Sequence, residues 1–330
     1  MQQLTGAGIL GTGHYVPERV LTNTDLESMV DTSDEWIRTR TGIEQRHLAA
    51  DNENTSDLAS KAAQRAMEAA GVLPEEIDFI IVATASPDYV IPSTACMVQK
   101  KLGCIKAGGI DLSAGCAGFV YGVSLGSQMV RTGMYQRVLV IGAEVLSRVV
   151  NWNDRNTCIL FGDGAGAAVL GPVQEGYGFL GADMGADGSL GNVLSIPASG
   201  VAEPVTHRAI DSGRIYIHME GSEVFKAAVR HMDATTLLAL KKADMTKEDI
   251  DLLIVHQANY RIIQATAKKL DIPPDKVFVN IEKYGNTSAA SVGIALDEAV
   301  RSGRIRRGDR IVMTGFGAGL AWGSVVMRWM

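Results

Sequence analysis

The spacing of apolar and polar positions along the chain predicts alternating helices and strands. Residues 55–70 place apolar side chains at helical spacing and end at Gly71, whereas 77–83 form one continuous apolar run, typical of a strand buried in a sheet. The same two patterns predict further elements at 107–112, 117–131 and 138–142. Strands alternating with helices in this way indicate an α/β protein.

This pattern begins again near residue 173. Three segments of the first part have counterparts, in the same order, in the second. They are 73–82 with 246–255, 130–134 with 300–304, and Gly164-Ala-Gly166 with Gly317-Ala-Gly319. Such a series indicates a duplicated unit. We therefore expect two halves, 1–172 and 173–330, each a mostly parallel sheet with helices on its faces.

Composition narrows the class of protein. The chain has 330 residues, of which 46% are apolar and 21% charged, as expected for a compact globular protein, and its net charge of -6 argues against a general nucleic-acid binder. No apolar run of about 20 residues is present, so we expect no membrane span. Four cysteines without regular spacing predict neither a disulfide framework nor a metal site, and Met1-Gln-Gln lacks the features of a signal peptide. We expect a cytoplasmic protein.

The stretch 111–122 carries the first candidate for chemistry, because it delivers Cys116 to the start of a helix. Unpaired N–H groups and the helix dipole at that position favour thiolate, and they can lower a cysteine pKa from about 8.5 to roughly 3.5–7.5. Cys116 is thus a candidate nucleophile. A free cysteine among alanine and glycine equally fits a small buried apolar residue, which is how we interpret Cys96, Cys104 and Cys158.

The duplication supplies two partners for this cysteine. An offset of 170 places Asn286 opposite Cys116, at the start of the corresponding helix, and the second apolar strand runs into His256 where the first has Ala83. Functional groups in open α/β sheets gather at the carboxyl ends of strands. Singly, His256 fits a core histidine and Asn286 a helix cap, but at matched positions they indicate catalysis.

Together these residues suit acyl transfer. A cysteine can accept an acyl group from a thioester. His256 and Asn286 can donate hydrogen bonds to one oxyanion, while the backbone N–H groups of Cys116 and Gly317 can form a second oxyanion hole. Two such holes beside one nucleophile indicate two successive substrates, one bound through its acyl carbonyl and one as an enolate.

Two other segments bear on ligands. Gly11-Thr-Gly13, expected in a glycine-rich loop after a strand, lacks the third glycine of a dinucleotide fingerprint, and Pro17 blocks the helix that would bind phosphates. The capped turn at 32–42 brings Trp36, Arg38 and Arg40 together. An indole beside guanidinium groups can stack on a purine and pair with phosphate, although surface packing fits the segment equally well.

At these residues the sequence resembles the β-ketoacyl-[acyl carrier protein] synthase III family. The similar motifs cover nearly the whole chain and lie at 11–17, 33–43, 114–119, 161–166, 256–259, 285–291 and 322–324. The resemblance implies a thiolase-like fold: a duplicated, five-layered αβαβα arrangement with two mixed sheets related by a pseudo-twofold axis. It also implies an acyltransferase that condenses an acyl-CoA primer, typically acetyl-CoA, with malonyl-acyl carrier protein at the start of type II fatty acid synthesis, without a cofactor.

The resemblance further implies roles for individual residues. Cys116 would carry the acyl group, and His256 and Asn286 would stabilise the malonyl thioester carbonyl during decarboxylation. The expected contacts with coenzyme A are Trp36, Arg40, Arg155, Gly221 and Asn259. Those expected with the acidic carrier protein are Lys226, Arg261, Lys268 and Lys269. Phe316 and Ile91 are expected at the acyl pocket, Ile91 from a loop that crosses to the partner in a homodimer.

Alternatives stay open at this point. The order Cys116, His256, Asn286 also occurs in papain-like hydrolases, although the local signature around their cysteine is absent here. A non-catalytic subunit of a synthase pair would usually lack the nucleophile. A homologous condensing enzyme of polyketide or other secondary metabolism is the nearest rival. Our hypothesis that Ile91, smaller than the phenylalanine of some family members, admits primers beyond acetyl would fail if acetyl-CoA turned over as well as longer acyl-CoAs.

Overall fold

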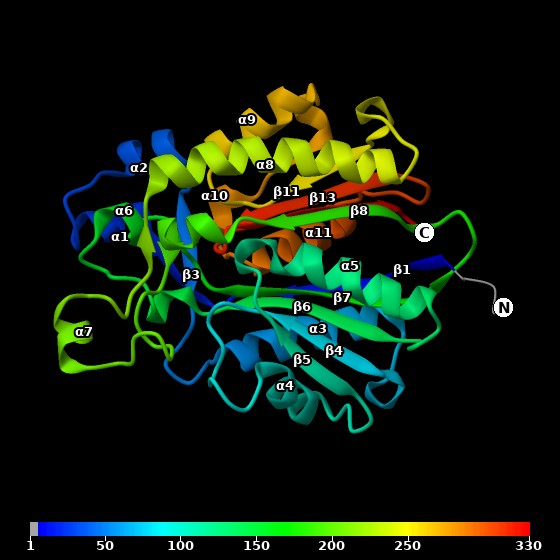
Figure 1. Cartoon of the computed structure of the whole chain (residues 1–330), viewed down its shortest axis with the longest axis horizontal. Coiled ribbons are helices and arrows are strands. Elements are labelled where there is room, and N and C mark those ends of the chain that lie inside the picture. The colour runs from blue at the N-terminus through cyan, green and yellow to red at the C-terminus, as the bar shows by residue number, and fades with distance from the viewer. Residues whose placement is uncertain (1–5) are drawn as a thin grey trace.

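A computed structural model describes residues 6–330; the start of the chain considered above for a signal peptide lies outside this range. Two five-stranded sheets lie one above the other, with a helical layer between them and one on each outer side (Figure 1). The α/β thiolase-like architecture of five layers is thereby confirmed. No helix within 6–330 is both long enough and apolar enough to cross a membrane.

The two sheets repeat one topology. The first has the order β1-β7-β6-β4-β5 and the second the order β12-β11-β13-β14-β8. The strands of the first are β1 (Gly6–Tyr15), β4 (Phe79–Ala83), β5 (Gly108–Leu112), β6 (Val138–Glu144) and β7 (Gly164–Val173). Those of the second are β8 (Gly178–Ala186), β11 (Leu252–Val255), β12 (Val277–Phe278), β13 (Arg310–Gly317) and β14 (Ala321–Arg328).

Both sheets are mixed, so the expectation of mostly parallel sheets is wrong, while the mixed sheets implied by the resemblance are confirmed. β4 runs parallel to β5 and β6, but β7 returns antiparallel to β6 and pairs antiparallel with β1. The second sheet does the same with β11, β13, β14 and β8. Two strands that follow each other along the chain pair in parallel only when a crossover connection carries the chain back to the starting edge of the sheet. No such crossover joins β6 to β7 or β13 to β14, so these pairs are antiparallel.

Six long helices complete the layers. α3 (Thr55–Ala70) and α4 (Thr94–Leu102) cover the outer face of the first sheet, and α8 (Gly221–Lys242) and α9 (Tyr260–Leu270) cover that of the second (Figure 1). α5 (Gly118–Arg131) and α11 (Ala290–Arg301) lie between the sheets and contact strands of both. The remaining short elements are α1 (Asn23–Glu27), α2 (Asp34–Thr41), α6 (Arg155–Cys158), α7 (His207–Asp211), α10 (Ile281–Tyr284), β2 (Arg19–Thr22), β3 (Gln45–Leu48), β9 (Leu194–Ser195) and β10 (His218–Met219).

The structure confirms two of the three repeated segments. Asp78, just before β4, accepts the backbone N–H of Arg137 at 2.8 Å, and Asp251, just before β11, accepts that of Arg310 at the same distance. The ends of α5 and α11 likewise match, since Gly133 and Gly303 both adopt φ near +70°.

The third repeated segment is not equivalent in the two sheets. Gly164 begins β7 and pairs with Glu144, whereas Gly317 ends β13 and pairs with Ala321. The structural counterpart of Gly164 is therefore Ala321. The two short sequences are therefore similar without occupying equivalent positions.

Gly11 and Gly13 lie inside β1 and not in a loop as expected. A Cβ atom on Gly11 would lie 2.6 Å from the carbonyl oxygen of Ala66 in α3, so both glycines allow a helix to pack directly on the strand. The short motif therefore serves close packing, and it does not begin a nucleotide-binding loop.

Candidate active site

Cys116 lies in a 3₁₀ turn, Gly115–Ala117, that leads directly into α5. Gly115 adopts φ +49°, and a Cβ atom there would lie 2.6 Å from the backbone nitrogen of Ala318. Glycine is thus required for the tight approach of this turn to the end of β13. The sulfur is carried on rigid secondary structure and is only 7% exposed.

The expected lowering of the Cys116 pKa is wrong. Removal of the thiol from water, aided by the nearby Glu144 carboxylate and opposed by a hydrogen bond with Ser288, raises its pKa to about 12. The helix N-terminus is present as predicted, but burial outweighs it because a low-dielectric cavity disfavours the charged form. The resting nucleophile is therefore a neutral thiol.

His256 directly follows β11, as the sequence predicts, and is 2% exposed. Its backbone N–H donates to the carbonyl of Thr314 at 2.8 Å, which fixes the residue against β13. Nδ1 of the ring lies 2.6 Å from Oγ of Ser291 in α11. Burial lowers the pKa of His256 to about 3, so the imidazole is neutral.

Asn286 is held by a short bridge to the segment after α6. Its N–H donates to Leu160 O at 2.8 Å, and its carbonyl accepts from the N–H of Gly162 at 3.1 Å. Its side-chain Oδ1 accepts the N–H of Ser288 at 2.8 Å, which leaves the Nδ2 donors for the cavity. The residue precedes α11 by four positions and does not cap it, so the helix-cap alternative is wrong.

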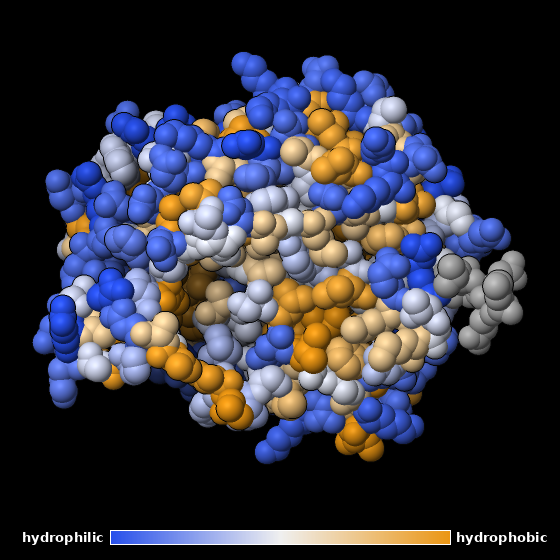
Figure 2. Space-filling view, viewed as in Figure 1, coloured by the Kyte–Doolittle hydropathy of each residue, from blue (hydrophilic) through white to orange (hydrophobic). Residues whose placement is uncertain are grey.

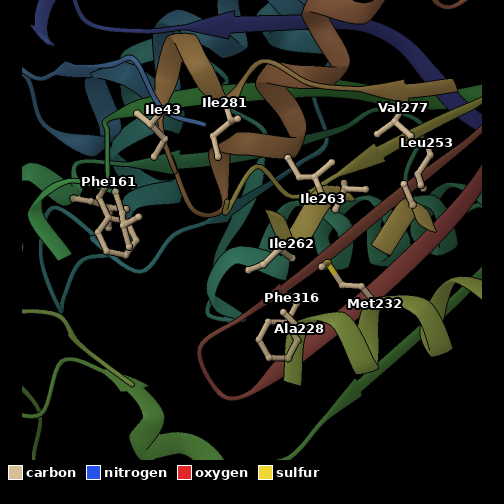
Figure 3. Packing of buried hydrophobic residues seen from close by; sticks show 14 of the residues in the cluster. Ile43, Phe161, Ala228, Met232, Leu253, Ile262, Ile263, Val277, Ile281 and Phe316 are labelled. Carbon is tan, nitrogen blue, oxygen red and sulfur yellow. The ribbon is translucent and has the colours of Figure 1, made fainter. Parts of the chain in front are cut away.

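These three side chains, from both halves of the chain, line one cavity of about 140 Å³. Gly317 and Phe316 of β13, together with Gly221 and Asn259, also line it. The other walls are largely apolar and belong to a core cluster that includes Phe161, Ala228, Met232 and Ile262 (Figure 3). The few polar side chains of the cavity are thus surrounded by largely apolar walls.

A groove of about 520 Å³ adjoins this cavity, and Leu160, Gly221, Phe225 and Asn259 line both. Of the three residues grouped by the sequence, Trp36 and Arg40 line the groove, whereas Arg38 does not and instead pairs with Glu44 at 2.7 Å. The Arg155 guanidinium lies 4.9 Å from the centre of the Trp36 ring and donates to Asp31 O at 2.9 Å. Only the family resemblance had grouped Arg155 with Trp36, and in the structure its guanidinium covers one face of this indole.

The basic residues expected to contact the carrier protein do not line one surface. Lys226 and Arg261 line the groove just described, whereas Lys268 lines a separate groove beside α9. Two of the lysines form ion pairs, Lys226 with Glu223 at 2.8 Å and Lys269 with Asp233 at 3.3 Å. Their charge is therefore partly neutralised.

Ile91 is not brought to the cavity of its own chain. Its side chain is 86% exposed, on the loop between β4 and α4.

Sequence reasoning missed the polar residues behind the site. Glu144, fully buried at the end of β6, accepts hydrogen bonds from the hydroxyl of Thr84, from the amide of Ala85 and from Ser86. Burial raises the pKa of Glu144. The sequence feature that could have identified Glu144 is a carboxylate that directly follows the apolar run 138–143. Ser288 and Ser291 gave none, because serine at a helix start is common.

Comparisons with known proteins agree with this geometry. Models of the 3-oxoacyl-[acyl-carrier-protein] synthase III family match residues 110–188 and, for its C-terminal part, 240–329. The β-ketoacyl-[acyl-carrier-protein] synthase III of Caldanaerobacter subterraneus subsp. tengcongensis is 57% identical over 100% of this chain and 99% of its own, and that of Desulfitobacterium hafniense is 55% identical over 99% and 98%.

Solved structures extend the likeness to the fold. The 3-oxoacyl-[acyl-carrier-protein] synthase III of Aquifex aeolicus matches with a TM-score of 0.91 and 48% identity, over 98% of this chain and 100% of its own. A priming β-ketosynthase from the R1128 polyketide pathway matches with a TM-score of 0.92 and 35% identity, over 100% and 98%. The chain belongs to the 3-oxoacyl-[acyl-carrier-protein] synthase III family.

Proposed function

We propose that this chain catalyses the decarboxylative condensation of an acyl-CoA with malonyl-acyl carrier protein to give 3-oxoacyl-carrier protein, coenzyme A and CO₂. The observation that carries the proposal is the convergence of Cys116, His256 and Asn286 on one cavity beside a basic, indole-containing groove. A papain-like hydrolase has no support, since the chain shares the fold and motifs of the synthase family.

The first half-reaction transfers the primer. The Cys116 sulfur attacks the thioester carbonyl, the bond from that carbon to the coenzyme A sulfur breaks, and the thiol proton ends on the departing coenzyme A. Because Cys116 is neutral at rest, its proton leaves as the new bond forms. The backbone N–H groups of Cys116 and Gly317 are the proposed donors to the oxyanion, which preorganised dipoles stabilise at no reorganisation cost.

The second half-reaction forms the carbon–carbon bond. The malonyl carboxylate leaves as CO₂, and its electron pair becomes an enolate whose oxygen accepts hydrogen bonds from His256 and Asn286. The enolate carbon attacks the acyl group, the bond to the Cys116 sulfur breaks, and the thiolate takes a proton from water. A neutral imidazole suits this role as a donor.

For coenzyme A we propose the groove at Trp36 and Arg40, with Gly221 and Asn259 along its inner end. Arg155 already covers one face of the indole, so a purine that stacks there either displaces this guanidinium or takes the opposite face. Arg40 and Arg155 then pair with the phosphates.

We also propose a homodimer in the cytoplasm. Within residues 6–330, β5 is an edge strand that pairs only with β4, and the nearby apolar side chains of Val90, Ile91 and Ile110 are exposed. Figure 2 shows apolar surface around the loop before α4 and along α5 on the same face. Pairing of β5 with its copy would cover this edge and carry Ile91 to the partner's acyl pocket. The free cysteines fit a reducing compartment.

The test is intact-mass measurement of the chain after incubation with a panel of acyl-CoAs, followed by malonyl-acyl carrier protein. The native chain should gain one acyl group and lose it again with release of CO₂, and Cys116→Ala should gain none. Cys158→Ala, which removes another buried thiol outside the cavity, serves as the matched control. An adduct on a cysteine other than Cys116, or one that malonyl-carrier protein cannot discharge, would contradict the proposal.

A further inference from the structure

The hydroxyl of Ser291 identifies which nitrogen of His256 carries the proton. Ser291 Oγ lies 2.6 Å from Nδ1 of the ring, and both side chains are buried. The N–H of Gln257 donates to the same oxygen at 3.4 Å. Within residues 6–330 this oxygen has no other hydrogen-bond partner, so Nδ1 is the single acceptor available to the hydroxyl hydrogen.

The opposite arrangement leaves a buried polar hydrogen unpaired. If Nδ1 carried the proton, it would donate to Ser291 Oγ, and the serine's own hydrogen would face no acceptor. Buried donors without partners are costly, so the bonded arrangement prevails. A neutral imidazole carries one ring proton, which is then on Nε2.

We propose that Ser291 is a positioning residue that holds the His256 ring with its proton on Nε2, so that the ring donates to the substrate oxygen and does not act as a base. The proposal rests on the function proposed above and deepens it. Since Nδ1 is bound to Ser291, Nε2 is the ring nitrogen left for the cavity that His256 lines. The same ring without a proton on Nε2 would repel an enolate oxygen.

The role predicts a split between the half-reactions. Transfer of the acyl group to Cys116 uses backbone donors and should change less than about twofold in Ser291→Ala. Condensation should fall severalfold, because only the fraction of rings that still carries the proton on Nε2 can donate to the enolate oxygen. Ser291→Thr keeps the hydroxyl and should restore condensation. Ser127→Ala is the matched control, because Ser127 is buried in α5 and, within the described residues, its hydroxyl has no hydrogen-bond partner.

The decisive measurement is ¹⁵N NMR of the native chain with labelled histidine, in which the signal lost in His256→Gln identifies the ring. We expect a protonated Nε2 and a bare Nδ1 in the native chain and in Ser291→Thr, and a mixture in Ser291→Ala. A proton on Nδ1 in the native chain would overturn the proposal, as would native condensation in Ser291→Ala. If the native chain condensed no substrate at all, the proposed function would fail while the NMR result still decided the ring form.

Discussion

Replacement of Gly317 by alanine should disable acyl transfer. An added Cβ atom would lie 2.8 Å from the Cβ of Cys116 and closer still to its backbone nitrogen, so β13 and the cysteine turn must separate. Overpacking of this kind costs about 1–3 kcal/mol of stability. Separation also moves one proposed oxyanion donor from its place, which typically lowers a rate by about 10²–10³-fold. We therefore expect a folded variant whose acylation rate is lower by about 10²–10³-fold.

Acylation of Gly317→Ala by acetyl-CoA can be followed by intact mass over time, with thermal unfolding measured in parallel. Gly188→Ala is the matched control, since a Cβ atom at Gly188 meets no other atom within 4 Å. It should behave as the native chain in both assays. If Gly317→Ala acylated at the native rate, the close approach of these two backbones would have no catalytic role, and the oxyanion hole proposed for the N–H groups of Cys116 and Gly317 would be wrong.

Two further predictions follow from the charges of the site. Because the folded pKa of Cys116 lies above its ordinary value, the thiol stays neutral through pH 7–10, and its alkylation by iodoacetamide should rise about tenfold per pH unit; a plateau below pH 8, measured on the Cys116 peptide by mass spectrometry, would show a lowered pKa instead. Lys268→Glu should raise the KM for malonyl-acyl carrier protein several-fold at low salt while that for acetyl-CoA stays unchanged, because Lys268 lies outside the groove at Trp36. Lys106→Glu makes the same charge change in the first half and should alter neither; equal KM values in both variants would remove Lys268 from the docking surface.

Much of the fold could be predicted because the sequence contains an internal repeat. The apolar strand and the helix end recur at nearly constant offsets, and the offset carried Asn286 and His256 to the cavity that Cys116 lines. Local signals were also sufficient for α3, which spans Thr55–Ala70 and ends at Gly71 with φ +63°. Such signals depend on neighbouring residues alone, which a sequence displays directly.

What failed depends on contacts between distant residues. Gly11 was expected in a loop because nothing nearby shows that α3 packs against it. Gly164 pairs with Glu144 and Gly317 with Ala321. These pairs depend on the register of the strands, which similarity between two short sequences does not reveal. Ser291 could not be recognised either, since its partner His256 lies 35 positions away and only the folded chain brings them together.

The same burial acts on the pKa values of Cys116 and His256. A helix end alone would supply thiolate, but the cavity that excludes water from the thiol also surrounds His256, whose pKa it lowers to about 3. Cysteine, histidine and asparagine are then all uncharged toward the cavity. A malonyl carboxylate that enters the cavity loses contact with water, and none of these three residues offers it a positive charge. Loss of CO₂ moves its charge to the thioester oxygen, where His256 and Asn286 can donate hydrogen bonds, so the same desolvation that weakens the nucleophile favours decarboxylation.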